Sequence, residues 1–258
     1  MNIVVCVKQV PDTAMERTLV GEGTLDRASV DGLINELDEY AIEEGLKIAE
    51  AHGGEVTILT MGPEKASESV RKALSMGADK AVHVVDGGLA GSDALATSLV
   101  LAAALKRTGF DLAVFGAEST DARTGVVPAM VAERLGVAQL TLASKVDISG
   151  PAVRVRRVTD DGYAVVSGSL PAVVSVVEKI NEPRYPTFKG IMAAKKKPVQ
   201  TLTLAGLGVD GGSVGLAGAA TWVDDFAARP PRSAGVIVKD EGDGGSKAAA
   251  FLAGRKFI

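Results

Sequence analysis

The sequence predicts an α/β fold built on an open, mostly parallel sheet, because short apolar runs alternate with helical patterns from residue 3 to about residue 177. The runs are continuously apolar, which is typical of parallel strands that are buried on both faces. The chain has 258 residues, 47% of them apolar, so it can bury a substantial core. Further along, alternating strands predict an antiparallel meander, and a Gly-rich tail predicts an extended C-terminal arm.

Each predicted element follows from a local signal. Apolar runs place the buried strands at 3–7, 56–61, 81–85, 112–115 and 172–177. Helix starts are predicted near Asp38 and at Ser92-Asp93 from capping side chains, and at Pro63 from a first-turn proline. A further helical pattern begins near Val126. The meander strands are expected at 141–148, 153–158 and 164–167, separated by Gly- and Asp-containing turns. A short final helix is expected from Lys247 to the C-terminus.

The chain is expected to divide into an α/β domain over residues 1–185 and an arm over residues 186–258. The arm holds prolines, the run Lys195-Lys196-Lys197 and a Gly-rich stretch. Its few apolar residues cannot bury a core of their own, so it needs another surface to lie against.

Composition excludes several classes of protein. The net charge is −4 and aromatic residues make up 4%, which argues against nucleic-acid binding. The single cysteine, Cys6, stands in an apolar run, so neither an internal disulfide nor a thiol metal cluster is expected, and a reducing compartment fits best. Neither a signal peptide nor a membrane-spanning stretch is recognisable, so the expected location is the cytoplasm without membrane insertion.

The strongest candidate for a binding site is the segment that follows the fourth buried strand. Open α/β sheets bind ligands outside the carboxyl ends of their strands, and glycines and hydroxyls let backbone amides approach a phosphate at a helix start. Thr124 and Gly125 are expected at such a start. The same residue types are also typical of an ordinary capped loop. The segment reads Gly116-Ala117-Glu118-Ser119-Thr120-Asp121-Ala122-Arg123-Thr124-Gly125.

This segment matches neither a P-loop nor a dinucleotide fingerprint, which disfavours triphosphate hydrolysis and simple Rossmann binding. Arg123 is the candidate cation for a phosphate, or equally a solvated surface charge. The loops after the first and second strands, and residues 35–38, are expected at the same sheet edge.

Catalytic groups are scarce in the sequence. His52 and His83 lie near no nucleophile motif, so helix-end and core roles are expected for them. The adjacent Glu43 and Glu44 diverge by about a hundred degrees on a helix, so they form no acid/base pair and are expected on a solvated face. Spaced metal ligands are missing as well, so neither a catalytic nor a metal site is predicted.

Two features of the arm suggest contacts. The lysine run can steer an acidic partner, tether a helix C-terminus, or be solvated and inert. Phe188, flanked by Pro186 and Gly190, is either an anchor for a partner or a core residue.

Several segments together resemble the β subunit of electron transfer flavoprotein, and the resemblance runs over nearly the whole chain. The matching segments are 5–12, Asn35 with 39–44, 73–79, 181–185 with 191–197, and 207–210. The resemblance implies a heterodimer whose α subunit carries most of the FAD site and receives the C-terminal arm. It also implies electron flow from acyl-CoA-type dehydrogenases of fatty acid oxidation toward a membrane quinone oxidoreductase, with the chemistry supplied by the flavin.

The resemblance further implies a structural AMP in this subunit. Its pocket would be formed by Cys6, Asn35, Glu36, Leu37, Asp38, Met61, Gly116, Ala117, Glu118, Ser119, Thr120, Asp121, Ala122, Arg123 and Thr124. The loop is shorter between Asp121 and Thr124 than in mitochondrial members, and Arg123 replaces small or amide residues. The run 36–38 differs from the aspartate-rich version of bifurcating relatives, which bind a second FAD, and this difference favours AMP.

Phe188 falls where the family presents a leucine that docks into a hydrophobic pocket of the dehydrogenase. Tyr185, Ile191 and Met192, in the same segment, are expected to bind the partner too.

Three alternatives remain at this point. One is a relative with a second FAD in place of AMP. Another is a stand-alone module of the universal-stress type, which shares the adenine-nucleotide-binding core but leaves the meander, residues 181–197 and the arm unexplained. The third, a nucleotide hydrolase or ligase, lacks metal-binding carboxylates and a phosphate lysine motif.

Overall fold

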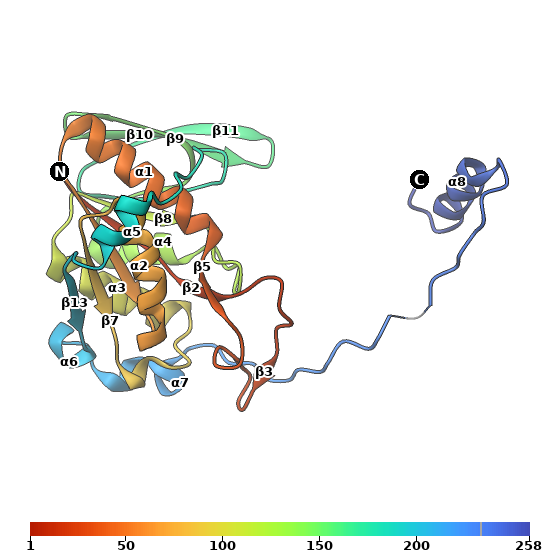
Figure 1. The fold of residues 1–258 in the computed structure, drawn as a ribbon, viewed down its shortest axis with the longest axis horizontal. Helices are drawn as coiled ribbons and strands as arrows, with labels where there is room; N and C mark the ends of the chain where they lie inside the picture. Colours follow the sequence, from red (N-terminus) through yellow and green to blue (C-terminus); the bar gives the residue numbers. More distant parts are fainter. Residues whose placement is uncertain (233) are drawn as a thin grey trace. The chain divides into compact units, whose positions relative to one another are not determined.

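The computed structural model describes residues 1–232 and 234–258. The chain forms two compact units, Met1–Asp224 and Asp225–Ile258. The first unit is built on a nine-stranded sheet with the order β11-β10-β9-β12-β8-β1-β6-β7-β13 (Figure 1). The predicted α/β class with an open, mostly parallel sheet is confirmed.

The parallel strands form the centre of this sheet. Their bounds are β1 (Asn2–Cys6), β6 (Glu55–Met61), β7 (Lys80–Val84), β8 (Leu112–Gly116) and β12 (Ala172–Val176). Neighbouring members pair in parallel, and each strand lies within a residue or so of its predicted position. A sixth strand, β13 (Val199–Leu202), pairs in parallel with β7 and was not predicted. It is an edge strand with three exposed residues out of four, so it lacks the continuous apolar run of a central strand.

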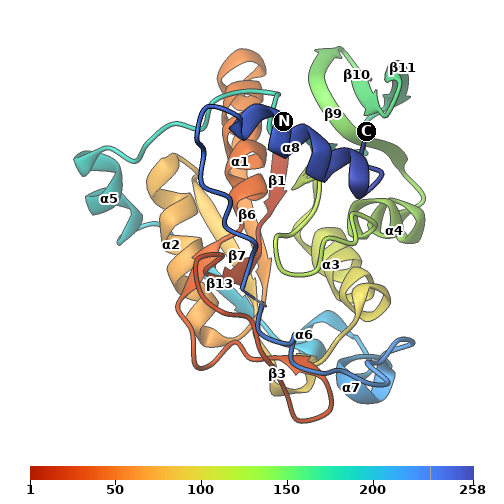
Figure 2. The same ribbon diagram turned by 90° about the vertical axis from the view of Figure 1, so that its right-hand side faces the viewer.

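Four helices cover the two faces of the sheet (Figure 2). They are α1 (Glu36–His52), α2 (Ser67–Met76), α3 (Ala94–Thr108) and α4 (Val127–Leu135). Asp93 caps α3 as predicted, because its carboxylate accepts a hydrogen bond from the Ala96 amide at 2.9 Å. The first helix starts near Asp38 as predicted, at Glu36, but the predicted cap is wrong, because the Asp38 carboxylate accepts instead from the Lys8 amide. After Pro63, a 3₁₀ turn, η1 (Glu64–Ala66), precedes α2.

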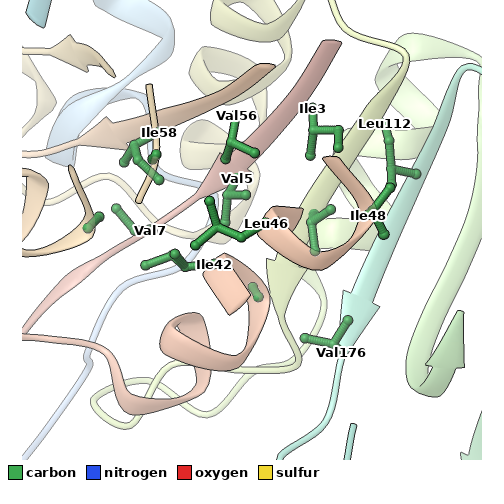
Figure 3. Close-up of a cluster of buried hydrophobic side chains, with 14 of the residues drawn as sticks. Ile3, Val5, Val7, Ile42, Leu46, Ile48, Val56, Ile58, Leu112 and Val176 are labelled. Atoms are coloured by element: carbon green, nitrogen blue, oxygen red, sulfur yellow. The ribbon is translucent and has the colours of Figure 1, made fainter. Parts of the chain in front are cut away.

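The core lies in two clusters, one on each face of the sheet. Along β1, Ile3 and Val5 join the cluster under α1 and α2, whereas Val4 and Cys6 join the cluster under α3 and α4. This alternation follows from the period of two in a strand. Figure 3 shows Val5 of β1 beside Leu46 of α1 in the first cluster. Both faces of the central strands are therefore buried, as the continuous apolar runs predict.

The predicted antiparallel meander is confirmed, with longer strands. Its members are β9 (Ala138–Ser149), β10 (Ala152–Thr159) and β11 (Gly162–Ser169). β9 also pairs in parallel with β12, which joins the meander to the central sheet.

The connection between β1 and α1 forms two small antiparallel ladders. β2 (Gln9–Pro11) pairs with β5 (Gly32–Ile34), and β3 (Leu19–Val20) pairs with β4 (Thr24–Leu25). A 3₁₀ turn, η2 (Gly87–Leu89), follows β7.

The rest of the first unit consists of short elements around β13. These are α5 (Phe188–Ala194), α6 (Leu204–Leu207), η3 (Gly211–Ser213) and α7 (Gly215–Gly218). α5 packs on α2. Whether the part after residue 185 packs on a partner subunit stays a prediction.

The second unit contains α8 (Gly244–Gly254), which begins three residues before the predicted start at Lys247. Across the described residues, every helix is too short or too polar to cross a membrane.

Candidate functional site

The candidate site lies where β8 ends and its loop meets the start of α1. Strand β1 lies between β8 and β6, so the loops after these three strands share one edge of the sheet, as predicted. At Gly116 a Cβ atom would come within 2.4 Å of Asp38 Oδ1 and 2.8 Å of the Leu37 carbonyl carbon. Only a glycine therefore lets the end of β8 approach α1 this closely.

Asn35 fixes the loop to the start of α1. Its Nδ2 donates to the Glu118 carbonyl at 2.9 Å, and its Oδ1 accepts from the Thr120 amide at 3.0 Å. The Asn35 residue is only 1% exposed, so both hydrogen bonds are shielded from water. One side chain thus satisfies a backbone acceptor and a backbone donor of the loop.

Asp121 ties the loop to two basic side chains from the segment between β1 and α1. Lys8 Nζ lies 2.9 Å from its Oδ1 and Arg27 Nη2 lies 2.5 Å from its Oδ2, while the Asp121 side chain is 1% exposed. Burial opposes ionisation, but the charges and hydrogen bonds of Lys8 and Arg27 hold the Asp121 pKa well below its usual range. Arg17 adds a bond to the Thr120 carbonyl at 2.7 Å. Three cations therefore converge on the loop.

Replacing Asp121 with asparagine is expected to destabilise the fold by about 1.5–3 kcal/mol at neutral pH, because it removes charge-assisted hydrogen bonds to Lys8 and Arg27. The ionised carboxylate stabilises the native state above its unfolded pKa of about 4, and this contribution is lost as the pH falls toward the lower folded pKa. Thermal melts from pH 3 to pH 7 should therefore show the wild type losing its advantage over the variant on acidification. Asp147→Asn, which breaks the exposed pair with Lys145, is the control and should change little. A constant difference between the Asp121 variant and the wild type across this pH range would contradict the account.

Asp38 and Cys6 are buried beside each other below the loop. Burial raises the pKa of the Asp38 carboxyl to about 7, against the hydrogen bonds that it accepts. Burial, together with the Asp38 charge, raises the pKa of the Cys6 thiol well above its ordinary value. Cys6 is therefore a protonated core residue rather than a nucleophile.

Arg123 and its neighbours form the exposed tip of the loop. Arg123 has φ of 49°, which is unusual for a residue other than glycine, and its Nη1 lies 3.0 Å from Glu118 Oε1. The candidate phosphate cation thus already has a carboxylate partner. Among the described residues the amides of Ala122, Thr124 and Gly125 have no acceptor. Thr124 and Gly125 directly precede the N-cap of α4, Val126, and α4 itself begins at Val127.

The remaining predicted pocket residues surround this centre at different depths. Ala117 donates its amide to the Val176 carbonyl, and Met61, at the end of β6, packs against the core cluster under α3. Glu36 and Thr120 line an open cleft of about 390 Å³ between β5, α1 and α2. The Thr120 hydroxyl is buried and has no partner among the described residues.

Arg17 and Arg27 were not predicted at the site. Both stand in a polar connection, more than ninety residues before the loop that they contact. No spacing or motif signals such a pair, so only the folded chain brings these groups together.

Two other expectations are settled by the structure. The expected solvated face at Glu43 and Glu44 is wrong: both are buried, and they contact Arg184 and Asn181. Phe188 is 81% exposed rather than part of the core.

The histidines lie at the expected places. His52 ends α1, and His83 is buried in β7, where burial lowers its pKa. In the described part of the chain no three His, Cys, Asp or Glu side chains gather to hold a metal ion.

Comparison with known proteins links this geometry to one family. Residues 22–207 match the model described as "Electron transfer flavoprotein domain". The chain is 51% identical to "Electron transfer flavoprotein subunit beta" of Mycobacterium tuberculosis (strain ATCC 25618 / H37Rv), over 100% of this chain and 99% of the relative. It is 37% identical to the protein of the same name from Clostridium acetobutylicum, over 92% of each chain. It is 39% identical to "Protein FixA" of Azorhizobium caulinodans, over 86% of this chain and 83% of the relative.

Proposed function

The chain belongs to the electron transfer flavoprotein family, on the β-subunit side, and from this premise we propose that it forms a heterodimer with an α subunit. This heterodimer carries electrons through FAD, held mainly by the α subunit, from acyl-CoA-type dehydrogenases to a membrane quinone oxidoreductase. It works in the cytoplasm. The flavin supplies the redox chemistry, and the residues of this chain bind a second nucleotide and present a docking surface.

We assign AMP to the edge of the sheet at the loop 116–125. The observation that carries this proposal is the convergence of three cations, Lys8, Arg17 and Arg27, with the single carboxylate of Asp121 on a loop with free backbone amides. Cations and free amides are the donors that bind a phosphate in proteins. The buried hydroxyl of Thr120, which has no partner among the described residues, can also bind a polar group of the ligand.

AMP serves a structural role in this proposal. The loop lies more than 80 residues after the start of α1 and the segment that precedes it, and all three contribute groups to the pocket. A nucleotide that contacts all three segments stabilises the native state by its binding free energy.

Purification tests the proposal most simply. Co-expressed with an α subunit, the chain should yield a yellow complex of two polypeptides. A colourless homodimer that binds ATP would indicate a universal-stress-type module instead. Turnover of ATP by the isolated chain would indicate a hydrolase or ligase.

Phe188→Ala should slow reduction of the heterodimer by its dehydrogenase while leaving the flavin content unchanged. Phe188 is exposed at the first position of α5, and truncation of an aromatic anchor at an interface commonly costs 2 kcal/mol or more, roughly thirtyfold in rate at limiting concentration. Stopped-flow reduction by an acyl-CoA dehydrogenase measures the effect. Val165→Ala, at an exposed valine of β11, is the control and should behave as the wild type. Unaltered reduction of the Phe188 variant would remove this residue from the docking surface.

A further inference from the structure

We propose that Arg184 is a positioning residue that holds the docking segment, residues 181–197, in a preformed conformation for the dehydrogenase. The inference rests on the proposed function, because it concerns how the surface around Phe188 is presented. Four apolar side chains of this segment are exposed: Tyr185, Phe188, Ile191 and Met192. Residues 181–187 form neither helix nor strand, so their position depends on contacts with the helices below.

The first anchor of the docking segment is an ion-pair clamp on α1. Arg184 Nε lies 2.7 Å from Glu43 Oε2, and its Nη2 lies 3.0 Å from Glu43 Oε1, which is a two-pronged arrangement. Its Nη1 also lies 2.6 Å from Glu50 Oε1, about two turns further along the same helix. The Glu43 carboxylate accepts the Arg184 amide as well, at 3.1 Å, so both side chain and backbone are fixed.

Asn181 extends this anchor to the neighbouring carboxylate. Its Nδ2 donates to Glu44 Oε2 at 3.0 Å and to the Tyr40 carbonyl at 3.1 Å. Glu43 and Glu44 are buried acids, and burial of an ionised carboxylate is costly unless it is paired. Their pairing with the docking segment explains why two adjacent glutamates occupy one turn of α1.

The second anchor lies at the other end of the segment, on α2. Lys197 Nζ donates to the carbonyl oxygens of Leu74, Gly77 and Ala78, which lie at the C-terminus of that helix. A cation there satisfies free carbonyls and interacts favourably with the helix dipole. Lys197 is therefore the tether among the three options for the lysine run, while Lys195 and Lys196 are exposed.

α5 connects the two anchors. Gly190 lies so close to α2 that a Cβ atom there would come within 2.5 Å of the Ser75 carbonyl oxygen. Thr187 caps α5 by accepting the Gly190 amide at 3.0 Å. Figure 2 shows α5 beside α2. A helix of seven residues is not stable alone, so the anchors on α1 and α2 determine where its apolar side chains lie.

The two anchors preorganise the docking segment before its partner binds. A surface that is already ordered loses less conformational entropy on binding, so its partner binds more tightly for the same contacts. Loss of the Arg184 clamp should weaken docking without altering the flavin or the electron-transfer step.

The test uses the heterodimer with its bound flavin. Arg184→Gln should raise the KM for the heterodimer about tenfold in reduction by an acyl-CoA dehydrogenase, with kcat and flavin content unchanged. Arg184→Lys keeps the charge but loses the two-pronged geometry, so it should restore only part of the affinity. Arg107→Gln, at the exposed end of α3, is the control for loss of one positive charge and should leave the KM unchanged.

Hydrogen–deuterium exchange supplies a readout that needs no dehydrogenase. The amide hydrogens of residues 184, 185 and 187–192 should exchange faster in Arg184→Gln than in the wild type, with the central strands unchanged. If Arg184→Gln does not fold because Glu43 is left buried and unpaired, the double variant Glu43→Gln/Arg184→Gln removes both charges and takes its place.

The outcomes separate the clamp from the proposed function. A KM or an exchange pattern equal to that of the wild type would overturn the clamp. A wild-type heterodimer that no acyl-CoA dehydrogenase reduces would contradict the proposed function, while the exchange measurement would still decide whether Arg184 orders the segment.

Discussion

Asn35→Ala is expected to release the loop 116–125 and to give the largest loss of stability among single changes at the site. The substitution leaves the Glu118 carbonyl and the buried Thr120 amide without their partner. Each unsatisfied buried group costs about 1–3 kcal/mol, so the loss is about 2–6 kcal/mol. For a unit of this size that corresponds to a melting temperature lower by at least about 4 °C.

Nucleotide binding should fall together with stability, because the same two hydrogen bonds set the course of the loop. Differential scanning calorimetry gives the first quantity, and the nucleotide content of the purified heterodimer gives the second. Asn2→Ala is the matched control, because Asn2 is exposed at the start of β1 and its side chain makes no hydrogen bond with the described residues. A variant at Asn35 that melts with the wild type and keeps its nucleotide would contradict the role of this side chain.

Gly116→Ala should produce a comparable effect by a different cause. The added Cβ atom would lie 2.4 Å from Asp38 Oδ1 and 2.9 Å from the Leu37 carbonyl oxygen. Part of this obstruction is backbone, so β8 and α1 must move apart, and such overpacking costs typically about 1–3 kcal/mol and occasionally more. The displacement separates the loop from Asn35, so nucleotide should be lost as well.

Gly87→Ala is the control for this change, because no atom lies within 4 Å of a Cβ at Gly87. Both variants add one methyl group, but only the one at Gly116 should lower the melting temperature and the nucleotide content. Equal melting temperatures for the two variants would show that the end of β8 can shift without cost.

The strands at the centre of the sheet could be predicted because their signal is local. Each is a continuous apolar run, because a strand that is buried on both faces needs apolar side chains at nearly every position. β13 was not predicted because most of its residues are exposed, and it joins the sheet only through its pairing with β7. An edge strand of this kind is defined by its neighbour rather than by its own residues.

The candidate site could be predicted in part, for the same reason. The loop 116–125 was placed at the correct edge, because right-handed crossovers bring the ends of parallel strands together. Asp38 was misplaced as a helix cap, because the Lys8 amide competes for its carboxylate, and no local pattern shows this competition. Glu43 and Glu44 were assigned to solvent, because their partners are about 140 residues further along the chain.

The identity of the bound nucleotides tests the central claim most directly. The heterodimer of this chain with its α subunit is purified without added nucleotide, denatured in acid, and its released nucleotides are separated and quantified. One FAD and one AMP are expected per heterodimer. Two FAD molecules without AMP would assign the pocket to a second flavin, and FAD alone would contradict the assignment of a nucleotide to the loop 116–125.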